Sequence, residues 1–171
     1  MTSYRPITDM IICARSKVKY YGAYPSGFLR RAKWLMPGGM LHLFGGHAAD
    51  DPFFGPQDET VDTEPMTRPT YLNDVMNFGS GVVGYQAVLA DPPYTEADAA
   101  HYGDLPCPNP NEVIKVAWGL TVPGGRCGLL HYVVPRPPDK SAILVAVCGV
   151  MVGFGNRIRV LTVFEKPKET P

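Results

Sequence analysis

Residues 85–94 read Tyr85-Gln86-Ala87-Val88-Leu89-Ala90-Asp91-Pro92-Pro93-Tyr94, and this stretch decides the expected fold. Residues 85–90 are largely apolar and predict a short buried strand. Two consecutive prolines then end the strand, because neither has an N–H group to donate to a neighbouring strand. We therefore expect Asp91 at the carboxyl edge of a sheet, where open α/β sheets bind their ligands. A carboxylate, a rigid carbonyl and the Tyr94 ring at one point suit a planar group that carries an amine.

Length and composition indicate a single globular unit. The chain has 171 residues, enough for one domain with a substantial core. Glycine and proline each occur 18 times, which predicts many turns and few long helices. The formal net charge is zero, which argues against tight autonomous binding of duplex DNA but allows a local basic patch. We interpret residues 1–171 as one domain, with residues 1–16 as an N-terminal arm and residues 166–171 as a mobile tail.

Cysteine spacing and hydropathy indicate whether the chain binds a metal or spans a membrane, and where in the cell it acts. The four cysteines, Cys13, Cys107, Cys127 and Cys148, are scattered, and no group of them has zinc-ligand spacing, so we expect no metal. The chain does not start with the apolar segment of a signal peptide. The longest apolar run, residues 142–155, is too short and too glycine-rich to span a bilayer. The sequence thus predicts a cytoplasmic location without a membrane partner.

A second strand end carries glycines. Residues 40–43 predict an apolar strand that is followed by Phe44, Gly45 and Gly46. Glycines at this point permit a positive φ angle and let a ligand approach the backbone closely. The residues that follow show only a shortened helix or none. An ordinary strand turn explains the same glycine pair.

Acidic residues mark two further strand ends. A β-prone stretch over residues 57–65 places Asp62 where nucleotide-binding α/β folds use an acid to accept hydrogen bonds from ribose hydroxyls. Glu64 is the second choice for that role, and a solvated acidic turn is the alternative. Residues 70–76 predict a third strand with Asp74 at its end, although an ordinary turn also fits this stretch.

Three helices and three more strands complete the expected fold. The predicted helices cover residues 28–35, a short stretch that Thr95 caps and Gly103 ends, and, after an Asn111 cap, residues 112–120. Residues 123–125, Pro-Gly-Gly, are expected to end the last helix. A strand over residues 128–134 and a terminal hairpin over residues 143–165 follow. The pattern predicts a mostly parallel α/β sheet with one reversed strand.

The motif Asp91-Pro92-Pro93-Tyr94 after an apolar strand resembles the catalytic motif of the S-adenosylmethionine-dependent amino-methyltransferases. These enzymes methylate the exocyclic amine of adenine, and less often that of cytosine, in DNA or RNA. The resemblance covers roughly residues 17–166, and the glycine turn departs from the family pattern Phe-x-Gly-x-Gly. It implies a Rossmann-like class I methyltransferase fold, with a mostly parallel seven-stranded sheet and a C-terminal antiparallel hairpin.

The resemblance also implies roles for individual residues. Asp91 and the Pro92 carbonyl would accept hydrogen bonds from the acceptor amine, and Tyr94 would stack on the base. Asp74 would contact the adenine amine of the cofactor. The full set of cofactor-binding candidates is Tyr21, Pro25, Phe44, Gly45, Gly46, Asp62 and Asp74, with Ser26 beside the first two at the methionine end of S-adenosylmethionine.

We expect a nucleic-acid partner, with DNA favoured over RNA. The connections over residues 74–85 and 94–111 leave no room for a target-recognition domain, which predicts weak sequence specificity, a short site, or help from a homodimer or an accessory protein. In this compactness it resembles phage-encoded members, which act in the host cytoplasm. Phosphate contacts, or simply a solvated charged face, are expected from Arg15, Lys17, Lys19, Arg30, Arg31 and Lys33. RNA, cytosine or another amine as acceptor stays open, as does a non-catalytic nucleotide-binding relative.

Overall fold

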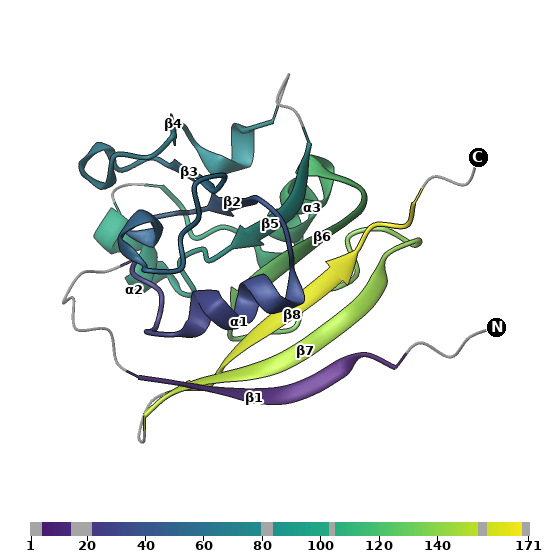
Figure 1. Cartoon of the computed structure of the whole chain (residues 1–171). Helices are drawn as coiled ribbons and strands as arrows, with labels where there is room; N and C mark the ends of the chain where they lie inside the picture. The colour runs from purple at the N-terminus through teal and green to yellow at the C-terminus, as the bar shows by residue number, and fades with distance from the viewer. Residues whose placement is uncertain (1–4, 15–21, 80–83, 103–104, 154–156, 169–171) are drawn as a thin grey trace.

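Eight strands form one mixed sheet with helices on both faces (Figure 1). The computed structural model describes residues 5–14, 22–79, 84–102, 105–153 and 157–168. Strand order across the sheet is β1-β7-β8-β6-β5-β2-β3-β4. β8 runs antiparallel to both of its neighbours, and the other strand pairs are parallel. The strands are β1 (Ile7–Cys13), β2 (Met40–Leu43), β3 (Glu59–Asp62), β4 (Tyr71–Leu72), β5 (Tyr85–Ala90), β6 (Thr121–His131), β7 (Ile143–Val152) and β8 (Arg159–Glu165).

Short helices connect the strands. The α-helices are α1 (Phe28–Leu35), α2 (Glu96–Ala99) and α3 (Pro110–Leu120). Single 3-10 turns are η1 (Ala48–Asp50), η2 (Pro65–Thr67), η3 (Val75–Asn77) and η4 (Ala100–Tyr102). The predicted shortening of the helix after β2 is confirmed, because only η1 stands there. None of the helices in the described ranges combines the length and apolarity needed to cross a bilayer.

The predicted architecture is confirmed except for its number of strands. The sheet is mostly parallel and ends in the antiparallel hairpin of β7 and β8, as expected. It has eight strands rather than seven, because residues 7–13 of the predicted arm form the edge strand β1. This strand pairs in parallel with β7, with Ile7 opposite Ala146 and Cys13 opposite Val152.

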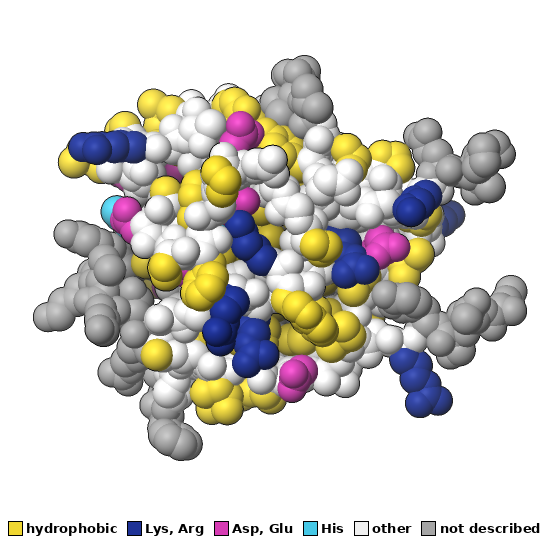
Figure 2. Space-filling model, in the orientation of Figure 1, with side chains coloured by type: hydrophobic (Ala, Val, Ile, Leu, Met, Phe, Trp, Pro, Cys, Tyr) yellow, Lys and Arg dark blue, Asp and Glu magenta, His cyan; other side chains and the backbone are white. Residues whose placement is uncertain are grey.

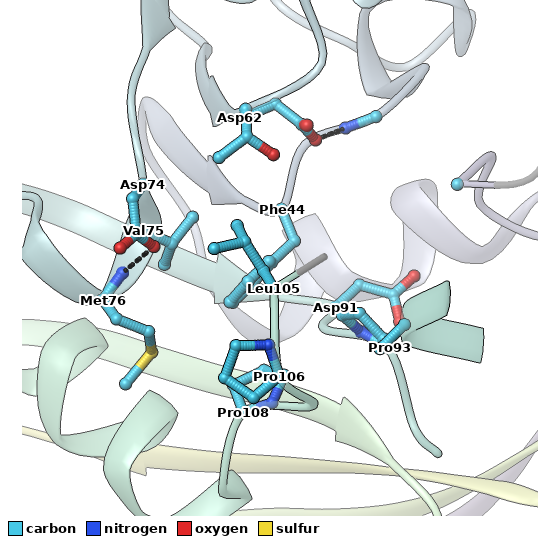
Figure 3. Close-up of a pocket in the computed structure, with 14 residues that line it drawn as sticks. Phe44, Asp62, Asp74, Val75, Met76, Asp91, Pro93, Leu105, Pro106 and Pro108 are labelled. Carbon is cyan, nitrogen blue, oxygen red and sulfur yellow. Dashed lines mark hydrogen bonds between the residues drawn. The ribbon is translucent and has the colours of Figure 1, made fainter. Parts of the chain in front are cut away.

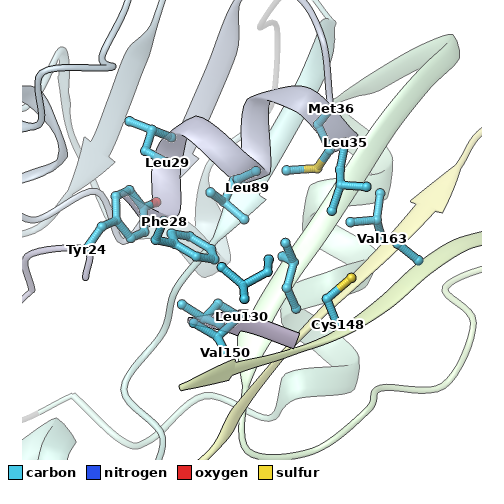
Figure 4. Packing of buried hydrophobic residues seen from close by; sticks show 14 of the residues in the cluster. Tyr24, Phe28, Leu29, Leu35, Met36, Leu89, Leu130, Cys148, Val150 and Val163 are labelled. Carbon is cyan, nitrogen blue, oxygen red and sulfur yellow. The ribbon is translucent and has the colours of Figure 1, made fainter. Parts of the chain in front are cut away.

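Strand β5 lies between two apolar cores, one on each face of the sheet. Ala87 and Leu89 point to the face covered by α1, and Val88 and Ala90 point to the face covered by α3. All four side chains are fully buried, as expected for a strand sandwiched between helical layers. Figure 4 shows the first core, in which α1 lays Phe28, Leu29 and Leu35 over β5, β6, β7 and β8.

The boundaries of three predicted elements were wrong. Asn109, not Asn111, caps α3 by accepting a hydrogen bond from the Asn111 N–H group at 2.9 Å, because Pro110 supplies the first helical position. Residues 123–125 do not precede the strand but lie inside β6, where the pairing with β5 slips between Tyr85 and Ala87. The strand over residues 70–76 shrinks to the two residues of β4, because Asp74 starts the turn η3.

Candidate functional site

A pocket opens at the carboxyl edge of the sheet, where β2, β3 and β5 end side by side. Its empty space is about 930 Å³, part of which is open to solvent. Figure 3 shows the acids Asp62, Asp74 and Asp91 around it. The lining residues are Gly22, Phe44, Gly46, Asp62, Thr63, Asp74, Val75, Met76, Asp91, Pro93, Ala99, Leu105, Pro106 and Pro108. Five residues predicted from the sequence are among them: Phe44, Gly46, Asp62, Asp74 and Asp91.

The glycine turn after β2 brings the backbone to the pocket. Phe44 and Gly46 both have positive φ angles, of 57° and 44°. A Cβ atom added at Gly46 would stand 2.4 Å from the carbonyl oxygen of Gly22, so this position has no room for a side chain. Gly45 does not line the pocket. It packs against β3, with its N–H group bonded to the Val61 carbonyl at 3.0 Å.

Asp62 ties the turn to the end of β3. Its Oδ2 accepts a hydrogen bond from the Gly46 N–H group at 2.7 Å, and its Oδ1 accepts one from the Glu64 N–H group at 2.9 Å. The carboxylate is therefore held in one orientation at the pocket wall. Each carboxylate oxygen has a second lone pair, which is available to a ligand hydroxyl.

Asp74 is held in the same way on the opposite wall. It caps the turn η3 by accepting a hydrogen bond from the Met76 N–H group at 3.0 Å. The Asn77 side-chain amide donates to its other oxygen at 2.6 Å. The apolar side chains of Val75 and Met76 follow directly and line the pocket with Phe44 (Figure 3).

Asp91 stands at the proline corner after β5. Its N–H group donates to the Leu43 carbonyl at 3.3 Å, which joins the ends of β5 and β2. The hydroxyl group of Tyr94 donates to Asp91 Oδ1. Close packing of protein atoms around the carboxyl group raises the pKa of Asp91 to about 6, although the Arg159 guanidinium and the Tyr94 hydrogen bond oppose that rise. Asp91 Oδ2 is the oxygen that Tyr94 leaves to a ligand.

The ring of Tyr94 is packed on several sides. Its centre lies 4.7 Å from that of Tyr132 and 5.3 Å from that of His131, which meets it edge to face. The guanidinium carbon of Arg159 lies 5.2 Å from the same ring centre. Burial and the neighbouring Asp91 charge raise the pKa of Tyr94 well above its usual range, so the phenol stays protonated and donates to the carboxylate.

The other predicted residues are not among those that line the pocket, or they lie outside the described part. Pro25 is buried before α1, where its carbonyl accepts a hydrogen bond from the Phe28 N–H group at 2.9 Å. Ser26 is exposed and bridges to Ala14. Pro92 is buried between Asp91 and Pro93 and does not line the pocket. Tyr21 lies outside the described residues.

Sequence reasoning missed the residues that surround Tyr94 and the wall formed by residues 105–108. His131 ends β6 beside the end of β5 and Tyr132 follows it, so their place at the same edge follows once the pairing of these strands is known. Arg159 begins β8, which runs in the opposite direction and so starts at this edge. Leu105, Pro106 and Pro108 belong to a proline-rich connection with no pattern that predicts a pocket wall.

The chemistry of the pocket fits a nucleoside cofactor. A fixed carboxylate at Asp62 suits vicinal hydroxyl groups, which donate hydrogen bonds. A second fixed carboxylate at Asp74, beside the apolar Val75, Met76 and Phe44, suits a flat ring that carries an amine. Gly46 lines the pocket with its backbone, which carries no side chain. A nucleoside with a further chain toward Asp91 therefore matches the donors and acceptors present.

Comparison with known proteins supports the fold. No protein-family model and no curated protein sequence matches the chain. Among solved structures, TrmN from Thermus thermophilus aligns with a TM-score of 0.56 and 16% identity over 84% of this chain and 49% of TrmN. The N-methyltransferase NodS from Bradyrhizobium japonicum WM9 aligns with a TM-score of 0.55 and 10% identity over 82% of this chain and 94% of NodS.

A second NodS structure, in complex with S-adenosyl-L-homocysteine, also aligns with a TM-score of 0.55 and 10% identity, over 82% of this chain and 86% of NodS. At such identities the likeness establishes the fold alone. The chain thus has a Rossmann-like class I methyltransferase fold, and it spans about half the length of TrmN.

Proposed function

We propose that this protein is an S-adenosylmethionine-dependent methyltransferase that acts on the exocyclic amine of adenine in DNA. The observation that carries this proposal is the position of Asp91. Its carboxyl group shares one pocket with the two fixed carboxylates of Asp62 and Asp74, and Tyr94 occupies only one of its oxygens. The class I methyltransferase fold of the chain supports the same function.

The cofactor is assigned to the carboxyl-edge pocket. Asp62 would accept hydrogen bonds from the ribose hydroxyls of the cofactor, and Asp74 would accept one from its adenine amine. Phe44, Val75 and Met76 would cover the adenine ring. When bound, S-adenosylmethionine supplies a sulfonium methyl group that is already strongly electrophilic. The task left to the protein is to hold and orient the acceptor.

Asp91 orients the acceptor amine. The lone pair of an exocyclic amine is delocalised into the ring, which makes the nitrogen a poor nucleophile. Hydrogen bonds from its N–H groups to Asp91 Oδ2 and to the Pro92 carbonyl favour a tetrahedral nitrogen and localise that lone pair. Tyr94 fixes the carboxylate through Oδ1, so that Oδ2 keeps its direction. In a duplex the base must first be flipped out of the stack.

Stacking of the acceptor on Tyr94 needs a rearrangement. Arg159 lies over the ring and Tyr132 packs against it, so a base gains the ring face when Arg159 leaves it. Base–aromatic stacking contributes about 1–3 kcal/mol. Recognition of the target site would involve a second copy of the chain or an accessory protein.

Product analysis tests the proposal. The wild-type protein is incubated with isotope-labelled S-adenosylmethionine and, separately, with DNA, RNA and free nucleosides, and mass spectrometry identifies the labelled base. We expect N6-methyladenine from DNA. Label in RNA or on cytosine would mean that the acceptor is a different one while the reaction is still methyl transfer to an amine. No labelled product from any acceptor, with cofactor bound, would favour a non-catalytic nucleotide-binding protein.

A further inference from the structure

Two arginines stand on aromatic rings directly beside Asp91. The guanidinium carbon of Arg159 lies 5.2 Å from the Tyr94 ring centre, and that of Arg157 lies 5.5 Å from the Tyr132 ring centre. The two rings are 4.7 Å apart between centres. These four side chains therefore form one continuous group, here called the cation–aromatic array. It touches the proposed transfer site through the hydrogen bond from Tyr94 to Asp91.

The positive charge of the array is not neutralised by ion pairs. Within the described part of the chain, neither Arg157 nor Arg159 has a carboxylate oxygen within 4.0 Å. Three other cations are paired: Lys33 with Asp58, Lys115 with Glu112, and Arg126 with Glu165. What distinguishes Arg157 and Arg159 is their position, because both contact rings next to Asp91 at the carboxyl edge of the sheet.

The other basic face is used differently. Figure 2 shows Lys and Arg side chains gathered over the face of the molecule that α1 covers. There Lys33 forms an ion pair with Asp58, and the guanidinium carbon of Arg30 lies 5.7 Å from the Phe53 ring centre. Phosphate contact was predicted for Arg30, Arg31 and Lys33 of this helix, together with Arg15, Lys17 and Lys19, which lie outside the described residues. The cation–aromatic array, by contrast, lies at the edge where the acceptor must arrive.

A phosphodiester suits the array chemically. A guanidinium group presents planar N–H donors that match two phosphate oxygens at once, and it sheds its hydration more easily than an ammonium group. The aromatic rings keep both guanidinium groups beside the proposed transfer site in the absence of substrate. Burial alone would lower the pKa of Arg159, but Tyr94, Asp91 and Tyr132 outweigh it and raise that pKa.

We propose that Arg157 and Arg159 bind the phosphodiester backbone next to the acceptor nucleotide, so that the substrate is a nucleotide within a polynucleotide strand. This inference rests on the proposed function, because it takes the acceptor to lie before Asp91. It names residues that no family pattern in the sequence pointed to. When Arg159 turns to a phosphate, it uncovers the face of Tyr94 on which the acceptor base stacks.

Equilibrium binding of a labelled oligonucleotide tests the inference. Fluorescence anisotropy measures the affinity of the full chain for a short fluorescein-labelled, adenine-containing single strand at several salt concentrations, once as DNA and once as RNA. The variants are Arg157→Gln and Arg159→Gln. The matched control is Lys140→Gln, which removes one positive charge from an exposed position before β7, at the opposite edge of the sheet.

Each arginine variant is expected to bind the oligonucleotide about tenfold more weakly than the wild type. The slope of log affinity against log salt concentration should become shallower by about one, as for the loss of one phosphate contact, while Lys140→Gln binds like the wild type. Arg159→Lys should recover only part of the affinity, because it keeps the charge without the planar donors. Unchanged binding by both glutamine variants would overturn the inference. So would an equal loss in Lys140→Gln, or competition by adenosine monophosphate as effective as that by the unlabelled strand.

Calorimetry with S-adenosylmethionine separates this inference from the proposed function. If the cofactor fails to bind the wild type while the arginine variants lose oligonucleotide affinity, the array is a phosphate site and the methyltransferase assignment fails. If the cofactor binds and the arginine variants keep wild-type oligonucleotide affinity, the inference fails alone. Normal cofactor affinity in the variants also shows that they are folded.

Discussion

At the scale of a single residue, the proposed role of Asp91 and its packing favour opposite protonation states of its carboxyl group. Its chemistry requires an ionised carboxylate that accepts hydrogen bonds from an amine, but close packing raises its pKa to about 6. The proposed methyl transfer should therefore increase as the pH rises through about 6 and then level off. Asp91→Asn, which cannot ionise, should lower the rate by about a hundredfold or more. A pH–rate profile of both proteins measures this, and a flat profile in the wild type would contradict it.

The same pKa predicts how stability depends on pH. The folded carboxyl group holds its proton more tightly than the unfolded one, whose pKa is about 3.9. Between about pH 4 and pH 6 the wild type should therefore lose stability as the pH rises, since the charged form is disfavoured in the fold. Asp91→Asn should lack this contribution and be the more stable protein at pH 7. Urea unfolding at several pH values tests this, and parallel stability curves would refute it.

Two glycines provide a matched pair of substitutions. Gly46→Ala should destabilise the protein by about 1–3 kcal/mol and weaken cofactor binding, because φ is positive and the new Cβ meets the Gly22 carbonyl. Gly119→Ala, on the exposed side of α3 with nothing within 4 Å, should stabilise it by about 0.5–1 kcal/mol. Thermal unfolding with and without cofactor measures both. Equal effects would show that the tight turn is not needed.

At the residue scale, much of the pocket could be predicted from the sequence. Asp91, Phe44 and Gly46 follow strands with a clear apolar pattern, and Asp62 ends a β-prone stretch, so their place at one edge follows from parallel pairing. The neighbours of Tyr94 could not be predicted. They come from β6 and β8, and only the antiparallel insertion of β8 brings Arg159 to the same edge.

At the scale of an element, α1 is fixed to the sheet by a buried polar network. Asp58 accepts hydrogen bonds from the Met40 and Gly55 N–H groups and forms an ion pair with Lys33 of α1. His42 Nε2 lies 3.7 Å from the same carboxylate, and the Tyr24 hydroxyl lies 3.1 Å from His42 Nδ1. Burial lowers the pKa of His42, so the imidazole is neutral at pH 7.

Removing the charge of Asp58 should destabilise this layer. Burial alone would raise the pKa of Asp58, but His42, the backbone donors and Lys33 outweigh it and hold the pKa well below its usual range. Asp58→Asn should cost about 3 kcal/mol at pH 7, because it leaves Lys33 without its partner. The stability difference between Asp58→Asn and the wild type should shrink below about pH 4. There the Asp58 carboxylate of the unfolded wild type takes up a proton while that of the folded protein stays ionised, which lowers the free energy of unfolding.

The exposed pair of Glu112 and Lys115 in α3 is the control for Asp58→Asn. Both side chains are more than half exposed, so Glu112→Gln should change stability by less than about 0.5 kcal/mol. Chemical unfolding of the three proteins at neutral and acidic pH makes the comparison. A loss in Asp58→Asn no larger than that in Glu112→Gln would contradict the structural role of the network.

Element boundaries show the limit of sequence patterns. The ends of α1 and β5 were predicted correctly, because apolar spacing, glycine and proline agree there. The start of β6 was not, since Pro123, Gly124 and Gly125 normally break a strand. Here they sit at a slip in the β5–β6 register, with Gly124 at a φ angle of 80°. A bulge of this kind depends on the partner strand and has no local sequence signal.

At the scale of the whole molecule, β1 enlarges the sheet by one strand. Its partner β7 lies near the other end of the chain, so the pairing could not be predicted from either segment alone. Ile11 and Cys13 complete the core under α1, while Ile12 stays exposed on the outer face. The alternation of buried and exposed residues explains why a short apolar run forms an edge strand rather than an arm.

One measurement tests the central claim most directly: calorimetric titration of the wild-type protein and Asp62→Ala with S-adenosylmethionine. The account predicts one binding site per chain in the wild type and much weaker binding in Asp62→Ala, with Asp139→Ala, an exposed acid before β7, as a control that binds normally. No heat at millimolar cofactor, or the same affinity in Asp62→Ala as in the wild type, would contradict the assignment of the carboxyl-edge pocket.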